Sequence, residues 1–441
     1  MDSYKITGGH KLSGEVQING AKNVALKALI ASLLTEDEVI IKNIPRISDL
    51  FSLIAIVNKF GASVELSHDH EIRVSSKNLN FGETYSHEFL RLRVSFMLMV
   101  PLLLRLGEFK IPSSGGDKIG VRPIDRTLEG LKQMGAEIKY EDGFYFGKAS
   151  RLKGTDYTFT KNTHTGTETL ILAAVLAEGK TVLNNAAEEP EIDDLIKMLN
   201  DMGARIKRIK GRTIVIAGVK KLHGTEFTVI PDRNEAVTFA ILSILTHSKI
   251  DIYPVVHSHL KTFYEALTQI GVGFQTQEHV LKIDGTKRPL STFDFETAPY
   301  PGFMTDWQAS WVLLMTQAEG VSHLWEKVFD NRFGYVSELN KMGADIRQYN
   351  PEVKNPDKEY NFNLNDGKNS FHAVEISGPT KLKGTDLFVS DLRAGATLVL
   401  AALTGAGESN VIGIEHIDRG YEDFDGRLKK LNARIERIKE V

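Results

Sequence analysis

The feature that most constrains this chain is a short phrase that occurs six times along it. Each copy has an apolar helix end, a glycine or asparagine, a small apolar residue, and then alternating strand residues. Glycine, and less often asparagine, adopts the left-handed conformation that ends a helix before a strand. The six copies are centred on Gly61, Gly135, Gly203, Gly271, Gly343 and Asn432. Such a recurrence predicts a fold built from six similar units.

Two further phrases complete the unit. A Leu-x-Gly phrase followed by alternating residues begins each unit. Two of the copies, around Leu79 and Leu290, are degenerate. Its clear copies are residues 12–14, 152–154, 222–224 and 382–384. An Ala- and Leu-rich helix, a glycine-containing turn and a strand follow, as in residues 172–182 and 398–411. Each unit therefore reads strand, helix, strand, helix, strand, strand, and we predict two α/β domains of three units in which sheets surround helices. Residues 349–370 lengthen the last interval and are expected to be an inserted loop or hairpin.

Length and composition limit the class of protein. The 441 residues exceed what one ordinary hydrophobic core organises, and 42% apolar with 25% charged residues is typical of globular proteins. The net charge of −3 gives no general attraction to nucleic acid or an anionic membrane. The most apolar run, residues 94–104, is too short to cross a bilayer and is expected to be a buried helix. Because residues 1–5 lack the features of a signal peptide, we expect a cytoplasmic protein. Because of the net charge and the short apolar run, we expect no nucleic-acid or membrane partner.

The residue types also limit the chemistry. The chain contains no cysteine, which excludes disulfides and thiolate metal sites. Its 13 histidines are scattered without the spacing of zinc or non-haem iron ligands, and no Walker phosphate loop is present. We therefore expect no metal site.

Two polar segments interrupt the apolar pattern where no structural need is evident. Lys22 and Asn23 lie at the expected N-terminus of a helix that runs to Leu34, where free backbone N–H groups favour an anion. The alternative is an exposed surface lysine. Residues 113–125 form a glycine-rich segment with two cations and two carboxylates, which suits either a closing lid or a surface connector.

Four more segments place charged residues at expected helix starts. Asp306 is either a functional acid or a simple helix N-cap. Arg332, Arg393 and Arg419 each follow an aspartate closely at a turn into a helix, where a structural ion pair is the simpler interpretation. If these turns occupy equivalent points of the repeat, they instead gather guanidinium groups that suit phosphate and carboxylate oxygens.

A set of longer motifs contains these segments. They are residues 19–23, 115–123, 177–179, 185–187, 189–192, 231–233, 305–306, 331–333, 391–394 and 416–422. With them the chain resembles, from end to end, the family of UDP-N-acetylglucosamine enolpyruvyl transferases. The resemblance implies two inside-out α/β domains with threefold pseudosymmetry, each of three βαβαββ-type repeats. One domain would span residues 22–231, and the other would join residues 1–21 to residues 232–441.

The resemblance also implies a reaction. The enolpyruvyl group of phosphoenolpyruvate would move to the 3-hydroxyl of UDP-N-acetylglucosamine by addition and elimination, with release of phosphate and without a cofactor. This is the first committed step of peptidoglycan synthesis, and hence of cell-wall formation, cell shape and division. Asp306 would take the proton of the hydroxyl, and Asp117 stands where the family places its acid.

The resemblance assigns the remaining site residues in two groups. Lys22, Arg122 and Arg419 would bind phosphoenolpyruvate, with Arg393 nearby. The residues implied to contact the UDP-sugar are Asn23, Arg93, Arg122, Pro123, Ile124, Asp125, Arg126, Lys161, Asn162, Thr163, His164, Asp306 and Val328.

The chain departs from the usual pattern of the family at three places, one of them a three-residue segment. Most members carry cysteine where this chain has Asp117, and the antibiotic fosfomycin alkylates that thiolate, so resistance is expected. The usual Ser-Val-Gly is here Thr163-His164-Thr165, and the usual arginine before Glu-Pro-Glu is Glu188. Two other functions stay open on sequence: an enolpyruvylshikimate phosphate synthase, and a non-catalytic paralogue that binds UDP-sugar. The sequence does not predict the oligomeric state.

Overall fold

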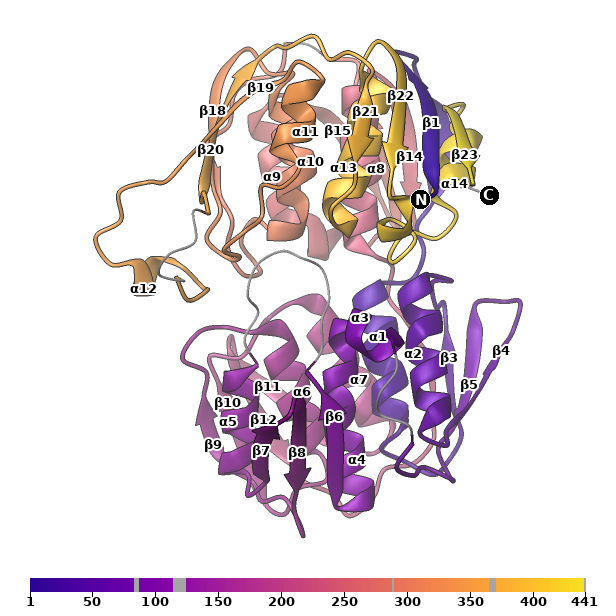
Figure 1. Ribbon diagram of the computed structural model, residues 1–441, viewed down its shortest axis with the longest axis vertical. Coiled ribbons are helices and arrows are strands. Elements are labelled where there is room, and N and C mark those ends of the chain that lie inside the picture. Colours follow the sequence, from indigo (N-terminus) through magenta and orange to yellow (C-terminus); the bar gives the residue numbers. More distant parts are fainter. Residues whose placement is uncertain (83–86, 114–123, 288, 365–369, 440–441) are drawn as a thin grey trace. The chain divides into compact units, whose positions relative to one another are not determined.

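The computed structural model describes all residues except 83–86, 114–123, 288, 365–369 and 440–441. The described residues form two compact units, whose elements can be followed in Figure 1. The first unit comprises the described residues between Gly20 and Ile230. The second comprises Met1–Asn19 and the described residues from Pro231 onward. The chain thus leaves the second unit after its first strands and returns to it for its second half.

The first unit begins with the helix that carries Lys22. Its elements are α1 (Lys22–Ser32), β3 (Val39–Lys42), α2 (Ser48–Lys59), β4 (Ser63–Leu66), β5 (Glu71–Ser75), α3 (His87–Arg91), the 3-10 helix η1 (Arg93–Leu98), α4 (Met99–Leu106), β6 (Glu108–Pro112), α5 (Asp125–Gln133), β7 (Glu137–Glu141), β8 (Phe144–Lys148), β9 (Asp156–Thr158), α6 (His164–Ala174), β10 (Lys180–Asn184), α7 (Pro190–Asp201), β11 (Arg205–Lys210), β12 (Thr213–Ala217) and β13 (Glu226–Thr228).

The second unit contains the N-terminal strands and the second half of the chain. Its elements are β1 (Ser3–Gly8), β2 (Ser13–Gln17), α8 (Arg233–Leu245), β14 (Lys249–Tyr253), η2 (His257–Leu260), α9 (Lys261–Gln269), β15 (Gly273–Gln277), β16 (Val280–Asp284), β17 (Phe295–Glu296), η3 (Thr305–Trp307), α10 (Gln308–Met315), β18 (Gly320–Trp325), α11 (Val336–Lys341), β19 (Asp345–Tyr349), α12 (Pro356–Glu359), β20 (Ala373–Gly378), β21 (Asp386–Phe388), α13 (Leu392–Thr404), β22 (Gly407–Ile412), η4 (Ile414–His416), α14 (Phe424–Lys430) and β23 (Arg434–Ile438).

The sixfold phrase has the same local geometry in every copy. The five glycines and Asn432 all have positive φ, from 68° at Asn432 to 102° at Gly343. In the first copy the N–H of Ala62 donates to the carbonyl of Val57 at 3.2 Å, and that of Gly61 donates to Asn58 at 3.0 Å. The other five copies have the same two hydrogen bonds, which define a Schellman helix end. The predicted helix-to-strand turns are therefore confirmed.

The Leu-x-Gly phrase marks a different constraint. A Cβ atom at Gly154 would lie 2.2 Å from the carbonyl oxygen of Lys180, and one at Gly384 would lie 2.0 Å from that of Glu408. Each glycine precedes a short strand that runs parallel to the strand near its close neighbour, β9 beside β10 and β21 beside β22. Glycine is required at these positions because the two backbones approach too closely for a side chain.

Five of the six sheets formed by the described residues share one order of strands. Across the sheet, the strands are the short first strand of a unit, then its second strand, then its fourth and then its third, as in β9-β10-β12-β11. The first and second strands pair in parallel. The sheet β6-β8-β7 has three of these strands. Two sheets borrow a strand across a long sequence distance, because β13 pairs with β3 and β2 pairs with β14. The N-terminal strand β1 completes a third, between β22 and β23.

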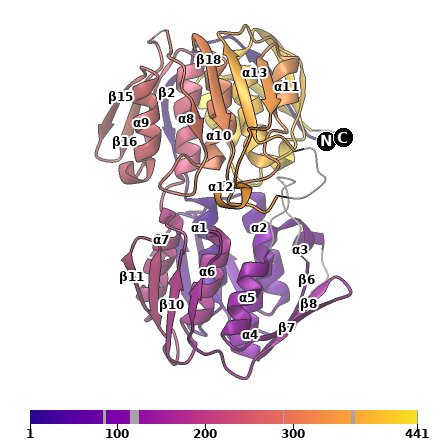
Figure 2. The same ribbon diagram turned by 90° about the vertical axis from the view of Figure 1, so that its left-hand side faces the viewer.

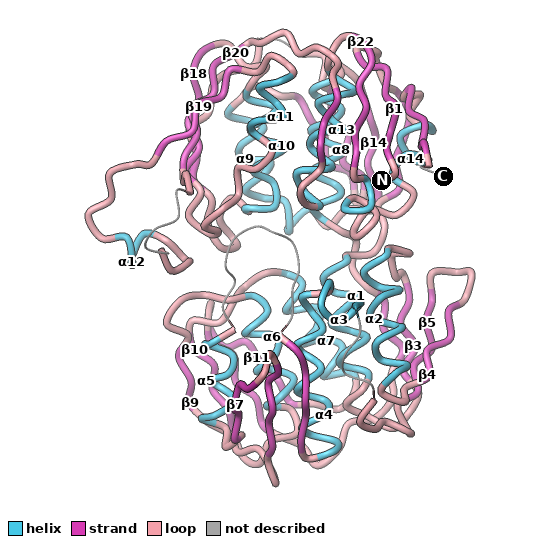
Figure 3. Tube along the Cα trace, in the orientation of Figure 1, coloured by secondary structure: helices cyan, strands magenta, loops and turns pink. Residues whose placement is uncertain are grey.

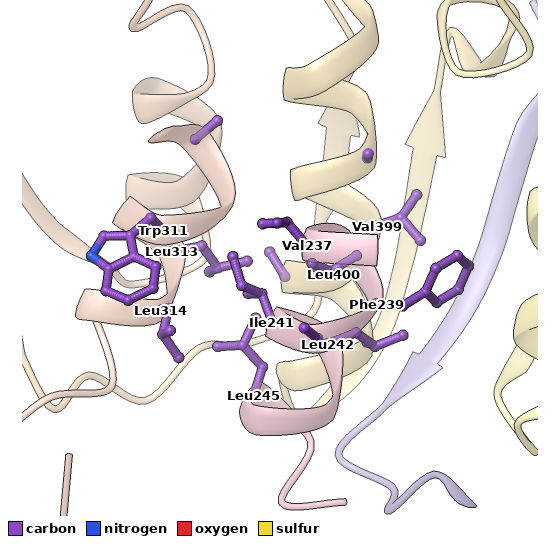
Figure 4. Close-up of a cluster of buried hydrophobic side chains, with 14 of the residues drawn as sticks. Val237, Phe239, Ile241, Leu242, Leu245, Trp311, Leu313, Leu314, Val399 and Leu400 are labelled. Atoms are coloured by element: carbon purple, nitrogen blue, oxygen red, sulfur yellow. The ribbon is translucent and has the colours of Figure 1, made fainter. Parts of the chain in front are cut away.

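Each unit has its helices inside and its sheets outside. Every residue of α8 and α10 is buried, and α13 is buried except for Arg393 and Thr404. Figure 4 shows Ile241 and Leu245 of α8 beside Leu313 and Leu314 of α10, and Figures 2 and 3 show strands around these helices. In the first unit α1 is buried almost throughout, and α6 is buried from Gly166 onward. The inside-out α/β architecture with three repeats in each unit is confirmed.

Two local predictions need refinement. Residues 94–104 are buried as expected, but they begin as the 3-10 helix η1 and continue as α4. The insertion between the antiparallel strands β19 and β20 contains a short helix, α12, which the sequence did not predict. Among the helices that the structure describes, none combines the length and apolarity needed to cross a membrane.

Candidate functional site

Asp306 lies at the centre of a charged cluster in the second unit. Its Oδ1 lies 2.8 Å from Nη2 of Arg332, and its Oδ2 lies 3.6 Å from Nη2 of Arg393. The side chain of Arg332 is 5% exposed and that of Arg393 11%, whereas that of Asp306 is 26% exposed. Neither η3 nor α10 receives a hydrogen bond from a capping side chain. Asp306 is therefore not a helix cap, and its carboxylate is accessible beside two buried cations.

Glu326, which directly follows β18, fixes the segments on either side of this cluster. One carboxylate oxygen accepts hydrogen bonds from the backbone N–H groups of Val328 and Phe329 at 2.8 and 3.0 Å. The other accepts from the hydroxyl of Thr305 at 2.9 Å. Burial raises the pKa of Glu326, although Arg332 and the hydrogen bonds oppose the rise. Glu326 thereby holds Thr305, the neighbour of Asp306, against the turn that carries Val328.

Arg393 is placed by the first turn of α13. Asp391 caps this helix, because its Oδ1 accepts from the N–H groups of Arg393 and Ala394 at 3.0 and 3.1 Å. Nη1 of Arg393 donates to the hydroxyl of Tyr421 at 3.2 Å. Burial alone would lower the pKa of Arg393, but Tyr421, Asp306 and Asp232 together raise it. Arg393 is therefore held as a cation.

The aspartates next to the three arginines have other structural roles. Asp330 lies 2.9 Å from Nε2 of His372, and Asp418 forms a bidentate pair with Arg437 at 2.6 and 2.9 Å. Asp391 caps α13, as described above. Arg332 and Arg393 converge on Asp306, which confirms that two of the three guanidinium groups gather at one place. Arg419 lies half-buried between η4 and α14.

In the first unit, Lys22 and Asn23 begin α1 as predicted. Lys22 is only 9% exposed, and its Nζ lies 2.6 Å from Oδ2 of Asp49. Asn23 is the one residue of α1 that is not buried. The alternative of an exposed surface lysine is therefore excluded, and the polar N-terminus of a buried helix remains as a place for an anion.

A second helix N-terminus carries the expected UDP-sugar residues 161–164. Thr163 caps α6 by accepting a hydrogen bond from the N–H of Gly166 at 3.2 Å. His164 Nε2 lies 3.2 Å from Glu168, which also lies 3.3 Å from Lys27. Burial opposes the charge on His164, but Glu168 outweighs it and raises the pKa of the imidazole.

The neighbouring expected residues are held mainly by backbone contacts. Nδ2 of Asn162 donates to the carbonyl of Asn185 at 3.3 Å, and Nη1 of Arg126 donates to the carbonyl of Lys161 at 3.5 Å. Ile124 precedes α5, and Asp125 begins it. Arg93 begins η1, with its guanidinium 5.7 Å from the ring centroid of Phe96. The expected site residues Asp117, Arg122 and Pro123 lie outside the described residues.

Three residues of these clusters were absent from the predicted site. Arg332 appeared only as one of three Asp-Arg segments, whereas Glu326 and Asp49 carried no signal at all. Glu188, which departs from the family pattern, lies 3.2 Å from Nε of Arg212. Within the described part of the chain, no group of three or more His, Asp or Glu is arranged to hold a metal ion.

Known proteins match the whole chain. The family described as EPSP synthase (3-phosphoshikimate 1-carboxyvinyltransferase) matches residues 6–428. The UDP-N-acetylglucosamine 1-carboxyvinyltransferase of Hydrogenovibrio crunogenus is 40% identical over 437 residues, covering 99% of this chain and 100% of that protein. The protein of the same name from Prochlorococcus marinus is 42% identical over 439 residues, covering 99% and 91%. Among solved structures, the enolpyruvyl transferase NikO from Streptomyces tendae has a TM-score of 0.87 at 25% identity, covering 100% of this chain and 99% of that chain.

Proposed function

The chain belongs to the family of UDP-N-acetylglucosamine 1-carboxyvinyltransferases, and from this membership we propose how its residues transfer the enolpyruvyl group of phosphoenolpyruvate to UDP-N-acetylglucosamine. The observation that carries the mechanism is the Asp306 carboxylate, accessible beside two buried arginines.

Asp306 acts as the general base. A sugar hydroxyl is a poor nucleophile, so a positioned base must take its proton as the oxygen attacks C2 of phosphoenolpyruvate. Arg332 fixes the carboxylate at 2.8 Å, and Glu326 fixes the adjacent Thr305. The exposed part of Asp306 is thus oriented before the substrate arrives, which reduces the reorganisation needed in the transition state.

Cationic residues bind the other substrate. Phosphoenolpyruvate carries a phosphate and a carboxylate, which arginine binds in bidentate fashion and lysine binds as a point charge. We assign these contacts to Lys22, Arg122 and Arg419, with Arg393 beside Asp306. Lys22 lies at the N-terminus of α1, where the helix dipole adds to its charge.

The reaction proceeds in two balanced steps. In the first, the sugar oxygen bonds to C2 while C3 gains a proton from Asp117, giving a tetrahedral phospho-ketal. In the second, C3 returns a proton to Asp117, the C2–O bond to phosphate breaks, and the enol ether leaves. The departing inorganic phosphate takes up the proton that Asp306 accepted in the first step.

The UDP-sugar is assigned to the residues that flank both helix N-termini of the first unit and to the turn at Val328. The N-terminus of α6 after Thr163, with His164, whose pKa is raised, suits the diphosphate. Asn23, Arg93 and the 122–126 segment complete the proposed contacts, together with Lys161 and Asn162. The product would enter peptidoglycan synthesis in the cytoplasm, and the absence of cysteine would confer resistance to fosfomycin.

A phosphate-release assay with two acceptors tests this function. The purified protein with phosphoenolpyruvate should release phosphate when UDP-N-acetylglucosamine is added and should not when shikimate 3-phosphate is added. The reverse result would identify a 3-phosphoshikimate 1-carboxyvinyltransferase. Tight binding of the UDP-sugar without phosphate release from either mixture would identify a non-catalytic paralogue.

A further inference from the structure

Three buried hydroxyl and carbonyl groups extend from Arg393 into the core of the second unit. Nη1 of Arg393 donates to the hydroxyl of Tyr421 at 3.2 Å, and this hydroxyl lies 2.8 Å from Oγ1 of Thr238. Oγ1 of Thr238 donates to the carbonyl oxygen of Asn234 at 2.9 Å. Tyr421 is 1% exposed, Thr238 6% and Asn234 5%.

The number of available protons fixes which group donates in each of these hydrogen bonds. A carbonyl only accepts, so the single hydroxyl proton of Thr238 goes to Asn234. The proton of Tyr421 must then go to Thr238, which leaves the lone pairs of the Tyr421 oxygen for the N–H of Arg393. Burial raises the pKa of Tyr421 although Arg393 and Thr238 lower it, so the phenol keeps the proton that this arrangement requires.

The same asparagine also anchors the neighbour of Asp306. Oδ1 of Asn234 accepts from Nε1 of Trp307 at 2.9 Å, and its backbone N–H donates to the cap residue Asp232 at 2.7 Å. The contacts therefore close a ring from Asn234 through Trp307 and Asp306 to Arg393, and back through Tyr421 and Thr238. A shift of either hydroxyl would move the guanidinium relative to the carboxylate, which lie 3.6 Å apart.

We propose that Tyr421 and Thr238 are positioning residues that hold the guanidinium of Arg393 in the orientation that binds phosphoenolpyruvate beside Asp306. The proposal rests on the proposed function, because it takes Arg393 as a contact for that substrate. Neither residue touches the reacting atoms. Their effect is on the binding of one substrate, since a preoriented arginine loses less freedom when it engages an anion.

The test is steady-state kinetics of Tyr421→Phe with a matched control. Removing one hydrogen bond to a charged group should raise the KM for phosphoenolpyruvate about 10-fold. The kcat and the KM for UDP-N-acetylglucosamine should change less than about 3-fold, because binding and not the chemical step is affected. Tyr4→Phe is the control, since the hydroxyl of the buried Tyr4 likewise accepts from an arginine, Nη2 of Arg437, at 2.7 Å, and Arg437 pairs with Asp418 and Asp425. It should leave the KM for phosphoenolpyruvate unchanged.

Thr238 provides a second measurement that does not depend on the folding of the tyrosine variant. Thr238→Val should raise the KM for phosphoenolpyruvate in the same way, and Thr238→Ser should restore it because serine keeps the hydroxyl. Thr246→Val removes a comparable hydroxyl bond at the other end of α8, where Oγ1 donates to Leu242 at 2.7 Å, and should have no effect on KM.

Two results would overturn different parts of the account. If the unmodified protein turns over but Tyr421→Phe matches Tyr4→Phe in KM, or Thr238→Ser behaves like Thr238→Val, the positioning role is wrong while the function stands. If the unmodified protein releases no phosphate from phosphoenolpyruvate and UDP-N-acetylglucosamine, the proposed function fails first.

Discussion

Replacing Asp306 by asparagine should remove most turnover while leaving the fold intact. The amide oxygen of asparagine can still accept from Nη2 of Arg332 at the 2.8 Å separation, so the geometry of the cluster is retained. The amide cannot take the proton of the sugar hydroxyl. Loss of a general base lowers the rate by about 10² to 10⁴, or about 3 to 5 kcal/mol in activation free energy.

The effect on stability should be smaller and separable. Arg332 is 5% exposed, and asparagine replaces a charge-assisted hydrogen bond with a neutral acceptor, which costs about 1 to 2 kcal/mol in free energy of unfolding. Asp306→Ala would leave Arg332 buried without its partner and should cost about 3 to 5 kcal/mol. The asparagine variant is therefore the informative one.

The assay combines kcat, calorimetric binding of UDP-N-acetylglucosamine and thermal unfolding. Asp193→Asn is the matched control. Asp193, on α7, pairs with Arg208 at 2.7 Å and has no role in the proposed chemistry. Its kcat should equal that of the unmodified protein. The reasoning is refuted if Asp306→Asn keeps more than about a tenth of the turnover, or if its kcat falls only in step with its stability.

Three further predictions concern charge. Arg419→Lys should raise the KM for phosphoenolpyruvate about 10-fold or more although the charge is kept, because bidentate geometry is lost; an unchanged KM would make Arg419 a structural residue. Asp117→Cys should become sensitive to fosfomycin and should keep its activity to higher pH, since free Asp titrates at about 3.9 and free Cys at about 8.5. If the variant is active but is not inhibited by the drug, residue 117 lies away from the reacting centre. Burial raises the pKa of Asp194 to about 7, with Glu191 adding to the rise while the N–H of Ile230 and Lys197 oppose it. Because the folded state holds this proton more tightly, protonated Asp194 stabilises the fold below about pH 4, and this stabilisation is lost as pH rises to about 7. The free energy of unfolding, measured relative to Asp194→Asn, should therefore fall by about 4 kcal/mol over this range. Parallel pH profiles of the two free energies would contradict the burial argument.

Local sequence rules predicted the repeats because each rule acts within one turn of chain. The left-handed residue after each helix depends only on its own φ and on hydrogen bonds three and five residues back, so Gly61 and its five counterparts could be identified without tertiary information. The N-terminal position of Lys22 followed from the same kind of reasoning. The sheet partners could not be identified in this way, because pairs such as Val16 with Ile252 join residues that are far apart in sequence.

The candidate site shows the same division. Asp306 was identified as either a cap or a base, and only its contacts with Arg332 and Arg393 separate the two, since both arginines come from other helices and turns. Glu326 and Tyr421 gave no separate signal because their roles depend on burial among partners from several repeats. The family resemblance identified residues that would contact the ligands. The structure adds the residues that hold those side chains in place.

The central claim is that the C–O bond of phosphoenolpyruvate breaks and its carbon skeleton moves to the sugar. The most direct measurement follows a heavy oxygen isotope placed in the bridge between C2 and phosphorus, with UDP-N-acetylglucosamine as acceptor. The account predicts that the isotope leaves in inorganic phosphate while mass spectrometry finds an unlabelled carboxyvinyl UDP-sugar. Isotope retained in pyruvate, which marks cleavage of the P–O bond, would contradict it.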